Sequence, residues 1–468
     1  MDDKKTYGSQ SDINSGDEIV ISGIAGKFPD SDNMNQLREN LFNKVNLVRP
    51  DHDRWKIENS NLPRYLGTIK NVKKFDADFF GFPSQEAHVL SPETRMLLER
   101  SYEAIIDAGI NPKQLRGKNT AVIMGITILE TQEKFLYEDL QIGGVNIVGC
   151  STFATANMIS CYLDLKGPSY TVDTSCSSSL YAVALGFYCI MSGICEDAII
   201  GTAHLCLHPF LNMQIAGLGV LSFDDYCRPF DIAANGFVRS ETVGVIYLQK
   251  AKNAKRIYAT CSNIKINNNG YMEEGILFPS TFMLSTLYKE FYNECKISTS
   301  CLDYIETHGT ATKANDPSEV NAIHNVLCKN RKSSLMIGSV KSNLGHPEPA
   351  SGIVQIAKVI IAFETGLIPP NIHYTSPRKD IDALFNGTVQ VVTEATPVKN
   401  GYIAINSFGF GGSIAHMLLK WNIKQKINNG APNDDLPRLV ILSGRTEESV
   451  KLFLNDFYDN SIFLIVDR

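Results

Sequence analysis

Residues 168–194 have the sequence PSYTVDTSCSSSLYAVALGFYCIMSGI, which predicts a strand that turns directly into a helix. Residues 168–174 are typical of a strand, and residues 177–192 repeat apolar side chains at helical spacing. Cys176 lies at the turn between them, where the positive N-terminal end of a helix favours an anion. We therefore expect a lowered thiol pKa, good nucleophilicity, and room among the flanking serines for a bulky group. An inert core thiol remains the alternative on local sequence alone.

Strands and helices alternate on both sides of this stretch. The predicted strands lie at 18–24, 119–126, 197–203, 243–250, 256–263, 301–307, 335–340, 401–407 and 415–421. The further predicted helices lie at 92–109, 317–330 and 349–365. This alternation favours an α/β fold whose sheets are buried between helices.

Composition excludes several classes of protein. The chain has 468 residues, and its formal net charge of −6 does not favour a nucleic-acid partner. Its apolar runs fall short of the roughly 18 residues that a membrane span needs. The eleven cysteines are scattered without a CxxC pair, so we expect neither a disulfide framework nor a metal site. Free cysteines and a polar start unlike a signal peptide favour a cytoplasmic protein.

The ends of the chain differ from its body. Residues 1–17 are polar and acidic, and we expect a disordered tail. Residues 422–436 carry Asn, Gly and Pro and are typical of a linker. The stretch 436–456 predicts a strand, a turn and a helix, as at the start of a further module. The segment 423–468 is therefore predicted to be a linker with the truncated start of that module.

Two of the nine histidines lie in unusual settings, each just after a predicted strand. His308 is in YIETHGTATKANDPSE and His346 is in IGSVKSNLGHPEPASG. Two imidazoles facing one thiolate would suit decarboxylative chemistry, because each Nε2–H could donate to a thioester carbonyl oxygen. The alternative is two turn histidines that cap backbone groups.

The stretch 405–416, INSFGFGGSIAH, is rich in glycine between two strands. It lacks the GxGxxG spacing and the following helix that a dinucleotide site requires. It predicts either a plain β-turn or a mobile loop that aims a backbone N–H at an oxyanion.

Four motifs in this order and spacing resemble the β-ketoacyl synthases, and above all the ketoacyl synthase region of animal, insect-like fatty acid synthase. They are VDTSCSSSL, ETHGTATKANDP, KSNLGHPEPASG and NSFGFGGS. The resemblance covers residues 18–422. It implies a thiolase-like fold, with two related halves, 18–255 and 256–422, in five α-β-α-β-α layers, commonly as a homodimer.

The resemblance also implies the residues of the site. Cys176 matches the acyl-accepting cysteine, and His308 and His346 match the two catalytic histidines. Lys341 and Glu319 match residues that orient these histidines. Phe410 matches the aromatic gate, whose N–H and that of Cys176 would form an oxyanion hole.

The implied reaction is a decarboxylative condensation. Cys176 would take an acyl group from acyl carrier protein, and a malonyl-carrier thioester would then lose carbon dioxide and attack that acyl group. The substrates would be attached as thioesters to the phosphopantetheine of the carrier, and the reaction would use no metal or other cofactor. Other fatty acid synthase domains are possible partners. The alternatives are a polyketide synthase condensing domain and a truncated, non-catalytic paralogue.

Five positions depart from the usual family pattern. Ala311 and Asn315 replace glycines in the loop after the first histidine. If position 311 needs a positive φ, its methyl group strains the loop, whereas Asn tolerates left-handed backbone better. Ser175, Ile414 and Thr202 replace an alanine, an asparagine and a glycine.

Overall fold

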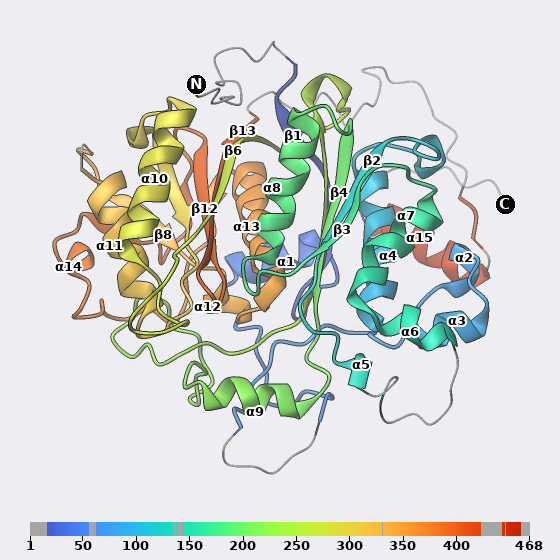
Figure 1. Cartoon of the computed structure of the whole chain (residues 1–468), viewed down its shortest axis with the longest axis horizontal. Coiled ribbons are helices and arrows are strands. Elements are labelled where there is room, and N and C mark those ends of the chain that lie inside the picture. Colours follow the sequence, from blue (N-terminus) through green and yellow to red (C-terminus); the bar gives the residue numbers. More distant parts are fainter. Residues whose placement is uncertain are drawn as a thin grey trace. The chain divides into compact units, whose positions relative to one another are not determined.

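Figure 1 shows the computed structural model of the chain. The structure describes residues 16–55, 62–133, 137, 144–329, 331–422, 442–444 and 446–459. It divides into two compact units, Met1–Ile423 and Lys424–Arg468. Most of the predicted tail and the predicted linker lie outside the described residues. In the second unit the structure describes one helix, α15 (Glu447–Asp459), within the module start that the sequence predicts.

The first unit contains two runs of helices and strands. The first run is β1 (Ile19–Lys27), α1 (Met34–Phe42), α2 (Ala77–Phe80), α3 (Ser84–Val89), α4 (Pro92–Asp107), β2 (Thr120–Gly125), α5 (Thr131–Glu133), α6 (Gly144–Cys150), α7 (Thr152–Leu163), β3 (Ser169–Val172), α8 (Ser178–Met191), β4 (Asp197–His204), α9 (Pro209–Gly217) and β5 (Thr242–Lys250). The second run is β6 (Ala259–Asn268), α10 (Thr281–Cys295), β7 (Leu302–Glu306), α11 (Asn315–Leu327), β8 (Leu335–Gly338), α12 (Lys341–Leu344), α13 (Ser351–Thr365), β9 (Leu367–Ile368), α14 (Asp382–Phe385), β10 (Val389–Val391), β11 (Thr396–Pro397), β12 (Tyr402–Phe408) and β13 (Ser413–Trp421).

The two runs have the same strand order. The large sheet has the order β10-β8-β7-β12-β13-β6-β1-β5-β4-β2-β3. The first half has the order β3-β2-β4-β5-β1, and the second half has the matching order β8-β7-β12-β13-β6. In both halves the first two pairs of neighbours are parallel and the last two are antiparallel. The halves join through a short ladder of β1 on β6, in which Val20 faces Thr260 and Ile21 faces Ala259. The chain is therefore built from two related α/β halves, as the resemblance implies.

Five layers follow one another in the described part of this unit (Figure 1). α10 and α11 cover one half of the sheet, α4 and α7 cover the other, and α8 and α13 lie between the two halves. The sequence explains this placement. α13 is buried at every position from Ser351 to Phe363, as expected for a helix that is packed on all sides. α10 instead buries one stripe, which includes Leu284, Leu287 and Phe291.

The central helices also bring the two halves of the site together. At Gly352, near the start of α13, an added Cβ would lie 2.6 Å from Ser179 Oγ and 2.8 Å from Leu180 of α8. The backbone N–H of Gly352 donates to that Ser179 hydroxyl at 2.7 Å. A glycine is thus required for the close approach of α13 to the N-terminus of α8, where Cys176 lies.

Candidate active site

Cys176 lies in a tight turn between β3 and α8, as the sequence predicts. Ser175 has a φ of 56°, and Ser177 and Ser178 donate their hydroxyls to the carbonyls of Thr174 and Ser175 at 2.9 and 2.6 Å. The hydroxyls of Ser177 and Ser178 bond within the turn and the flanking serines do not line the cavity, so the room that they leave for a bulky group stays a prediction. They fix the strained backbone that presents Cys176.

The Cys176 thiol is only 4% exposed. Burial raises its pKa to about 12; the charge of Glu348 adds to this, whereas the Ser175 hydroxyl and Lys341 oppose it. The expected lowering of the thiol pKa is therefore wrong for the free site, because burial outweighs the helix N-terminus. Cys176 therefore rests as a thiol.

His308 lies two residues after the end of β7, where two side chains hold its peptide groups and a backbone N–H holds its ring. Glu319 of α11 accepts the N–H groups of His308 and Gly309 at 2.9 and 3.0 Å. Lys341 Nζ donates to the carbonyl of His308 at 2.7 Å. Phe408 N–H donates to Nδ1 of His308 at 3.3 Å, which places the proton of the neutral ring on Nε2.

His346 follows β8 and α12 and is held by the segment before β5. Its N–H donates to the carbonyl of Val238 at 2.7 Å, and its carbonyl accepts the N–H of Ser240 at 3.1 Å. Its ring meets that of His308 edge to face, with 5.5 Å between the centroids. Burial, followed by the charge of Lys341, holds the pKa of both histidines well below the usual range, so both rings are neutral.

Cys176, His308 and His346 line one cavity of about 240 Å³. They come from the carboxyl ends of β3, β7 and β8, which belong to different halves of the fold. The lining includes apolar and polar side chains. The apolar ones include Leu218, Val220, Ile276 and Phe278, and the polar ones include Thr310, Thr312 and Asn315. The structure thus brings Cys176, His308 and His346 together in one cavity, and their catalytic roles stay predictions.

The glycine-rich stretch forms the hairpin turn between β12 and β13. At Gly409, an added Cβ would lie 2.1 Å from the carbonyl oxygen of Thr174, so only glycine allows this turn to approach the Cys176 turn. Phe410 lines the cavity beside Cys176. Among the hydrogen bonds of the described residues, the N–H groups of Cys176 and Phe410 donate none to another residue. Both remain available to an oxyanion, as the resemblance implies; the gate role of Phe410 stays a prediction.

The replaced glycines have different consequences. Ala311 has a φ of 58° and is fully buried, so its methyl group strains the loop as expected. Asn315 instead begins α11 and donates its side-chain amide to Thr310 at 3.2 Å, so the question of left-handed backbone does not arise there. Thr202 and Ile414 are fully buried in β4 and β13.

The sequence analysis missed a buried polar cluster behind His346. Arg239 forms an ion pair with Glu348, donates to Asn212 at 3.1 Å and lies 3.2 Å from His204 Nε2. A sign of this cluster in the sequence is the acidic Glu348, two positions after His346.

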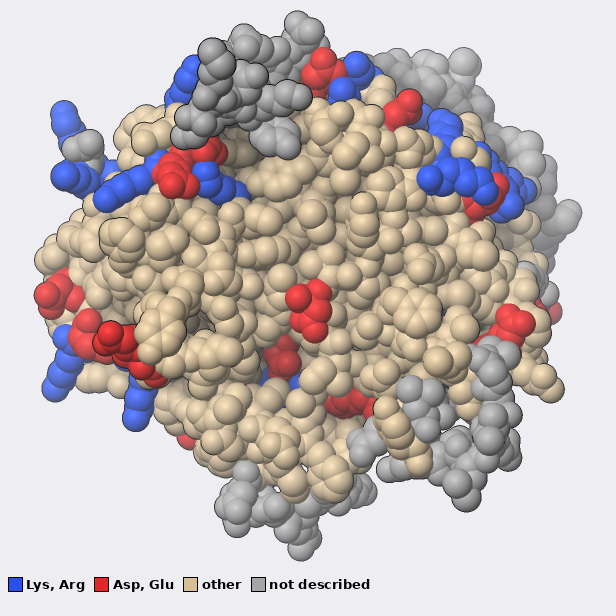
Figure 2. All heavy atoms as spheres, viewed as in Figure 1, with Lys and Arg blue, Asp and Glu red and all other residues tan. Residues whose placement is uncertain are grey.

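The outer surface and the interior show three further features. On the face in Figure 2, Lys and Arg side chains lie mainly toward the margins, interspersed with Asp and Glu. No helix in the described ranges is both long and apolar enough to cross a membrane. Within the same ranges, no group of three or more His, Cys, Asp or Glu side chains is placed to hold a metal ion.

Comparison with known families decides the assignment. Residues 16–254 match the family described as Beta-ketoacyl synthase, N-terminal domain, and residues 258–375 match its C-terminal domain. The chain belongs to the β-ketoacyl synthases. Residues 377–462 match the ketoacyl-synthetase C-terminal extension, which includes the stretch predicted to begin a further module. As a β-ketoacyl synthase, the chain is a condensing enzyme of the acyltransferase type.

Relatives from two pathways are similar to this β-ketoacyl synthase. A fatty acid synthase of the goose Anser anser anser is 45% identical over 351 residues, which are 75% of this chain and all of that sequence. The highly reducing polyketide synthase SAT13 of Stachybotrys chartarum is 32% identical over 92% of this chain, which spans 19% of its length.

A solved structure has the same fold. The ketosynthase from module 6 of the bacillaene synthase from Bacillus subtilis has a TM-score of 0.84 and 29% identity, over 96% of this chain and 78% of its own. This likeness agrees with the thiolase-like architecture.

Proposed function

We propose that this β-ketoacyl synthase acts in fatty acid synthesis and condenses a malonyl thioester with an acyl group carried on Cys176. The observation that carries the proposal is the single cavity of about 240 Å³ lined by Cys176, His308 and His346. A nucleophilic thiol beside two neutral imidazoles matches the two demands of the reaction, which are acyl transfer and stabilisation of an enolate.

In the first half-reaction, Cys176 Sγ attacks the carbonyl carbon of an acyl thioester. A new S–C bond forms, the old C–S bond breaks, and the carrier leaves as a thiol with the proton that Cys176 gives up. The N–H groups of Cys176 and Phe410 would stabilise the tetrahedral oxyanion. Because the resting thiol is buried and protonated, this proton transfer accompanies attack.

In the second half-reaction, a malonyl thioester enters and loses carbon dioxide. The electron pair of the broken C–C bond moves into the thioester and forms an enolate, whose oxygen accepts Nε2–H bonds from His308 and His346. The enolate carbon then attacks the acyl carbonyl, and Cys176 leaves and regains a proton. Neutral rings suit this role because they donate without giving up their protons.

Fatty acid synthesis is favoured over polyketide synthesis by the relatives. The goose fatty acid synthase is 45% identical to this chain. The polyketide synthases SAT13 and PksL are 32% and 29% identical to it. The polyketide alternative is kept because such synthases, among them PksL of Bacillus subtilis, match up to 95% of this chain. The chain spans only 10–19% of the length of these two polyketide synthases.

The partners follow from this chemistry. We propose acyl carrier protein as the donor of both thioesters, each held on phosphopantetheine, with no metal or further cofactor and with a cytoplasmic location. A homodimer is favoured by the edge strand β3 and the neighbouring α7, where Tyr170 and Phe153 are 48% and 57% exposed.

The proposal is tested by incubating the protein with acyl-carrier and malonyl-carrier and measuring carbon dioxide and β-ketoacyl product. We expect both products from the wild type and no condensation from Cys176→Ala. Absence of both products from folded wild-type protein would reject the enzymatic role.

A further inference from the structure

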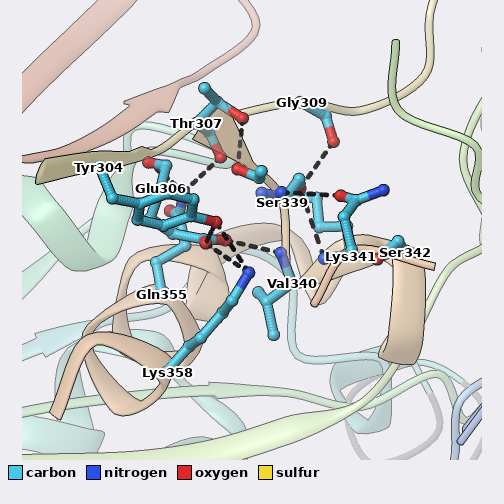
Figure 3. A network of polar contacts seen from close by, with 12 residues as sticks. Tyr304, Glu306, Thr307, Gly309, Ser339, Val340, Lys341, Ser342, Gln355 and Lys358 are labelled. Atoms are coloured by element: carbon cyan, nitrogen blue, oxygen red, sulfur yellow. Dashed lines mark hydrogen bonds and ion pairs between the residues drawn. The ribbon is translucent and has the colours of Figure 1, made fainter. Parts of the chain in front are cut away.

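A buried carboxylate, Glu306, lies at the centre of a network of polar contacts (Figure 3). It stands two residues before His308 and does not line the cavity. It is the last residue of β7 and is fully buried. One oxygen, Oε1, accepts the N–H of Val340 at 2.6 Å. The other, Oε2, accepts the Tyr304 hydroxyl at 2.6 Å and lies 2.8 Å from Lys358 Nζ. An ionised group so far from solvent needs such partners, and all of them are present.

The bond to Val340 connects two catalytic segments. Val340 directly precedes Lys341, and the Lys341 ammonium donates to the carbonyl of His308. Ser339 Oγ donates to the carbonyl of Gly309 at 2.9 Å and so forms a second connection between the ends of β7 and β8 (Figure 3). Movement of the Glu306 carboxylate would therefore shift both the Lys341 turn and the His308 loop.

Lys358 and Tyr304 hold Glu306 from the other side. Lys358 projects from α13 and donates to the Tyr304 hydroxyl at 2.9 Å, while Tyr304 is on the same strand as Glu306. The backbone makes room for this ring at Gly338, where an added Cβ would lie 2.5 Å from the Tyr304 hydroxyl. Glu306, Tyr304 and Lys358 therefore form a buried cluster in which each side chain contacts the other two.

The charge of Glu306 also acts on Lys341. Burial lowers the pKa of the Lys341 ammonium, and Glu306 is the largest influence that opposes this lowering. Glu319 from α11 also favours the charged ammonium, as Cys227 and Cys176 would in their deprotonated forms. Lys341 in turn disfavours protonation of His308 and His346. Glu306 is thus the largest electrostatic influence that favours the charged form of Lys341, a buried cation that touches the His308 peptide.

We propose that Glu306, held by Lys358 and Tyr304, is a positioning residue that fixes the Lys341 turn against the His308 loop. The role rests on the proposed decarboxylative condensation. The charged ammonium polarises the His308 peptide and stabilises the negative charge that develops on the thioester during loss of carbon dioxide. Glu306 makes no contact with the reacting atoms.

The test compares Glu306→Gln with the wild type in decarboxylation of malonyl-pantetheine, with kcat and KM measured as functions of pH. The amide keeps the size but removes the charge that favours the Lys341 ammonium. We expect kcat to fall about tenfold or more while KM changes less than about twofold. We also expect the alkaline limb of kcat, where the rate falls as the pH rises, to lie about one pH unit lower than in the wild type.

A second readout does not depend on activity. Lysines labelled with 13C at Cε report their own titration by NMR, and the Lys341 signal is assigned by its loss in Lys341→Met. The titration midpoint of Lys341 should fall by about one pH unit or more in Glu306→Gln. An unchanged midpoint would overturn the proposal, whether or not the wild type decarboxylates the thioester. Wild-type protein without activity, but with the expected NMR shift, would reject only the proposed function.

Two further variants separate positioning from folding. Asp303→Asn removes a buried carboxylate from the same strand, where Asp303 accepts the N–H groups of residues 399–401 rather than acting near Lys341. The pH profile of kcat for Asp303→Asn should match that of the wild type, even if the variant unfolds at a lower denaturant midpoint. Glu306→Gln with Lys358→Met removes the buried pair as a whole, so it should fold if the single variant does not. In the double variant, the alkaline limb of kcat should remain at the lower pH found for Glu306→Gln. An alkaline limb at the pH of the wild type would contradict the proposal.

Discussion

Phe408 donates its backbone N–H to Nδ1 of His308 at 3.3 Å. Since a neutral imidazole carries one proton, this bond leaves the proton on Nε2, the nitrogen that can donate to a substrate oxygen. The donor is the last residue of β12, and it immediately precedes the glycine-rich turn that carries Phe410. One hairpin therefore sets the tautomer of His308 and also supplies an N–H for an oxyanion.

The first prediction concerns the charge of the two histidines. Because burial and Lys341 depress their pKa values, His308 and His346 should stay neutral well below pH 6.5, the ordinary value. Their contribution to stability is then present above that pH and is lost as the pH falls toward the depressed values. Imidazole 15N NMR checks this, with the wild type compared with His308→Ala for assignment. An imidazolium signal from His308 at neutral pH would refute the mechanism.

The second prediction concerns Glu319, whose oxygens accept two backbone N–H groups of the His308 loop. Glu319→Gln replaces one acceptor oxygen by an NH₂ group, which cannot accept and should displace the loop. We expect decarboxylation of a malonyl thioester to fall about a hundredfold, because small misplacements of catalytic groups have effects of this size. Acylation of Cys176 should be nearly retained; an equal loss of both activities would indicate general misfolding instead.

The third prediction concerns the strained loop. Ala311→Gly relieves a positive φ that costs about 1–2 kcal/mol, and it removes a buried methyl group that contributes about 1 kcal/mol. The free energy of unfolding should therefore rise by up to about 1 kcal/mol. Chemical denaturation measures the change. Destabilisation by the glycine would mean that packing of the methyl group against Leu221 and Phe237 outweighs the strain.

The fourth prediction lies outside the site. Glu93 of α4 is buried, neither of its carboxylate oxygens has a hydrogen-bonding partner among the described residues, and burial raises its pKa to about 7. The folded state binds the Glu93 proton more tightly than the unfolded state, in which the pKa of Glu93 is 4.5. The free energy of unfolding therefore falls as the pH rises from 4.5 to about 7. The full loss above neutral pH is about 3 kcal/mol.

Glu93→Gln removes this pH dependence. The variant should be more stable than the wild type by roughly 1–3 kcal/mol near pH 8 and should differ little near pH 5. Urea unfolding at both pH values gives the comparison. Equal stability at the higher pH would show that Glu93 finds a partner or water that offsets its burial.

The strands could be predicted because most are fully buried and stand between clear turn signals. The prediction for 197–203 differs by one residue from β4, and that for 349–365 begins two residues before α13. Several helices were not predicted, among them α1, α7, α9 and α10. α9 is a short surface helix without a clear apolar stripe, whereas α10 carries its stripe in a sequence that mixes aromatic residues with Thr and Asn.

The residues of the site could be predicted, but their electrostatics could not. Cys176, His308 and His346 stand in motifs with distinctive turn residues, so their meeting was foreseeable. The direction of the Cys176 pKa shift was not, because it depends on how deeply three distant segments bury the thiol. The same holds for Arg239 and Glu348, which are far apart in the chain and pair only in the fold.

The central claim is that Cys176 carries the acyl group in condensation, and a two-step mass measurement tests it most directly. The protein is first incubated with an acyl thioester, and its Cys176 peptide is weighed before and after addition of a malonyl thioester. We predict an acyl adduct on Cys176 that disappears on addition of the malonyl thioester, with one carbon dioxide released per adduct. A folded protein whose Cys176 stays unmodified, or whose adduct persists beside the malonyl thioester, would contradict the account.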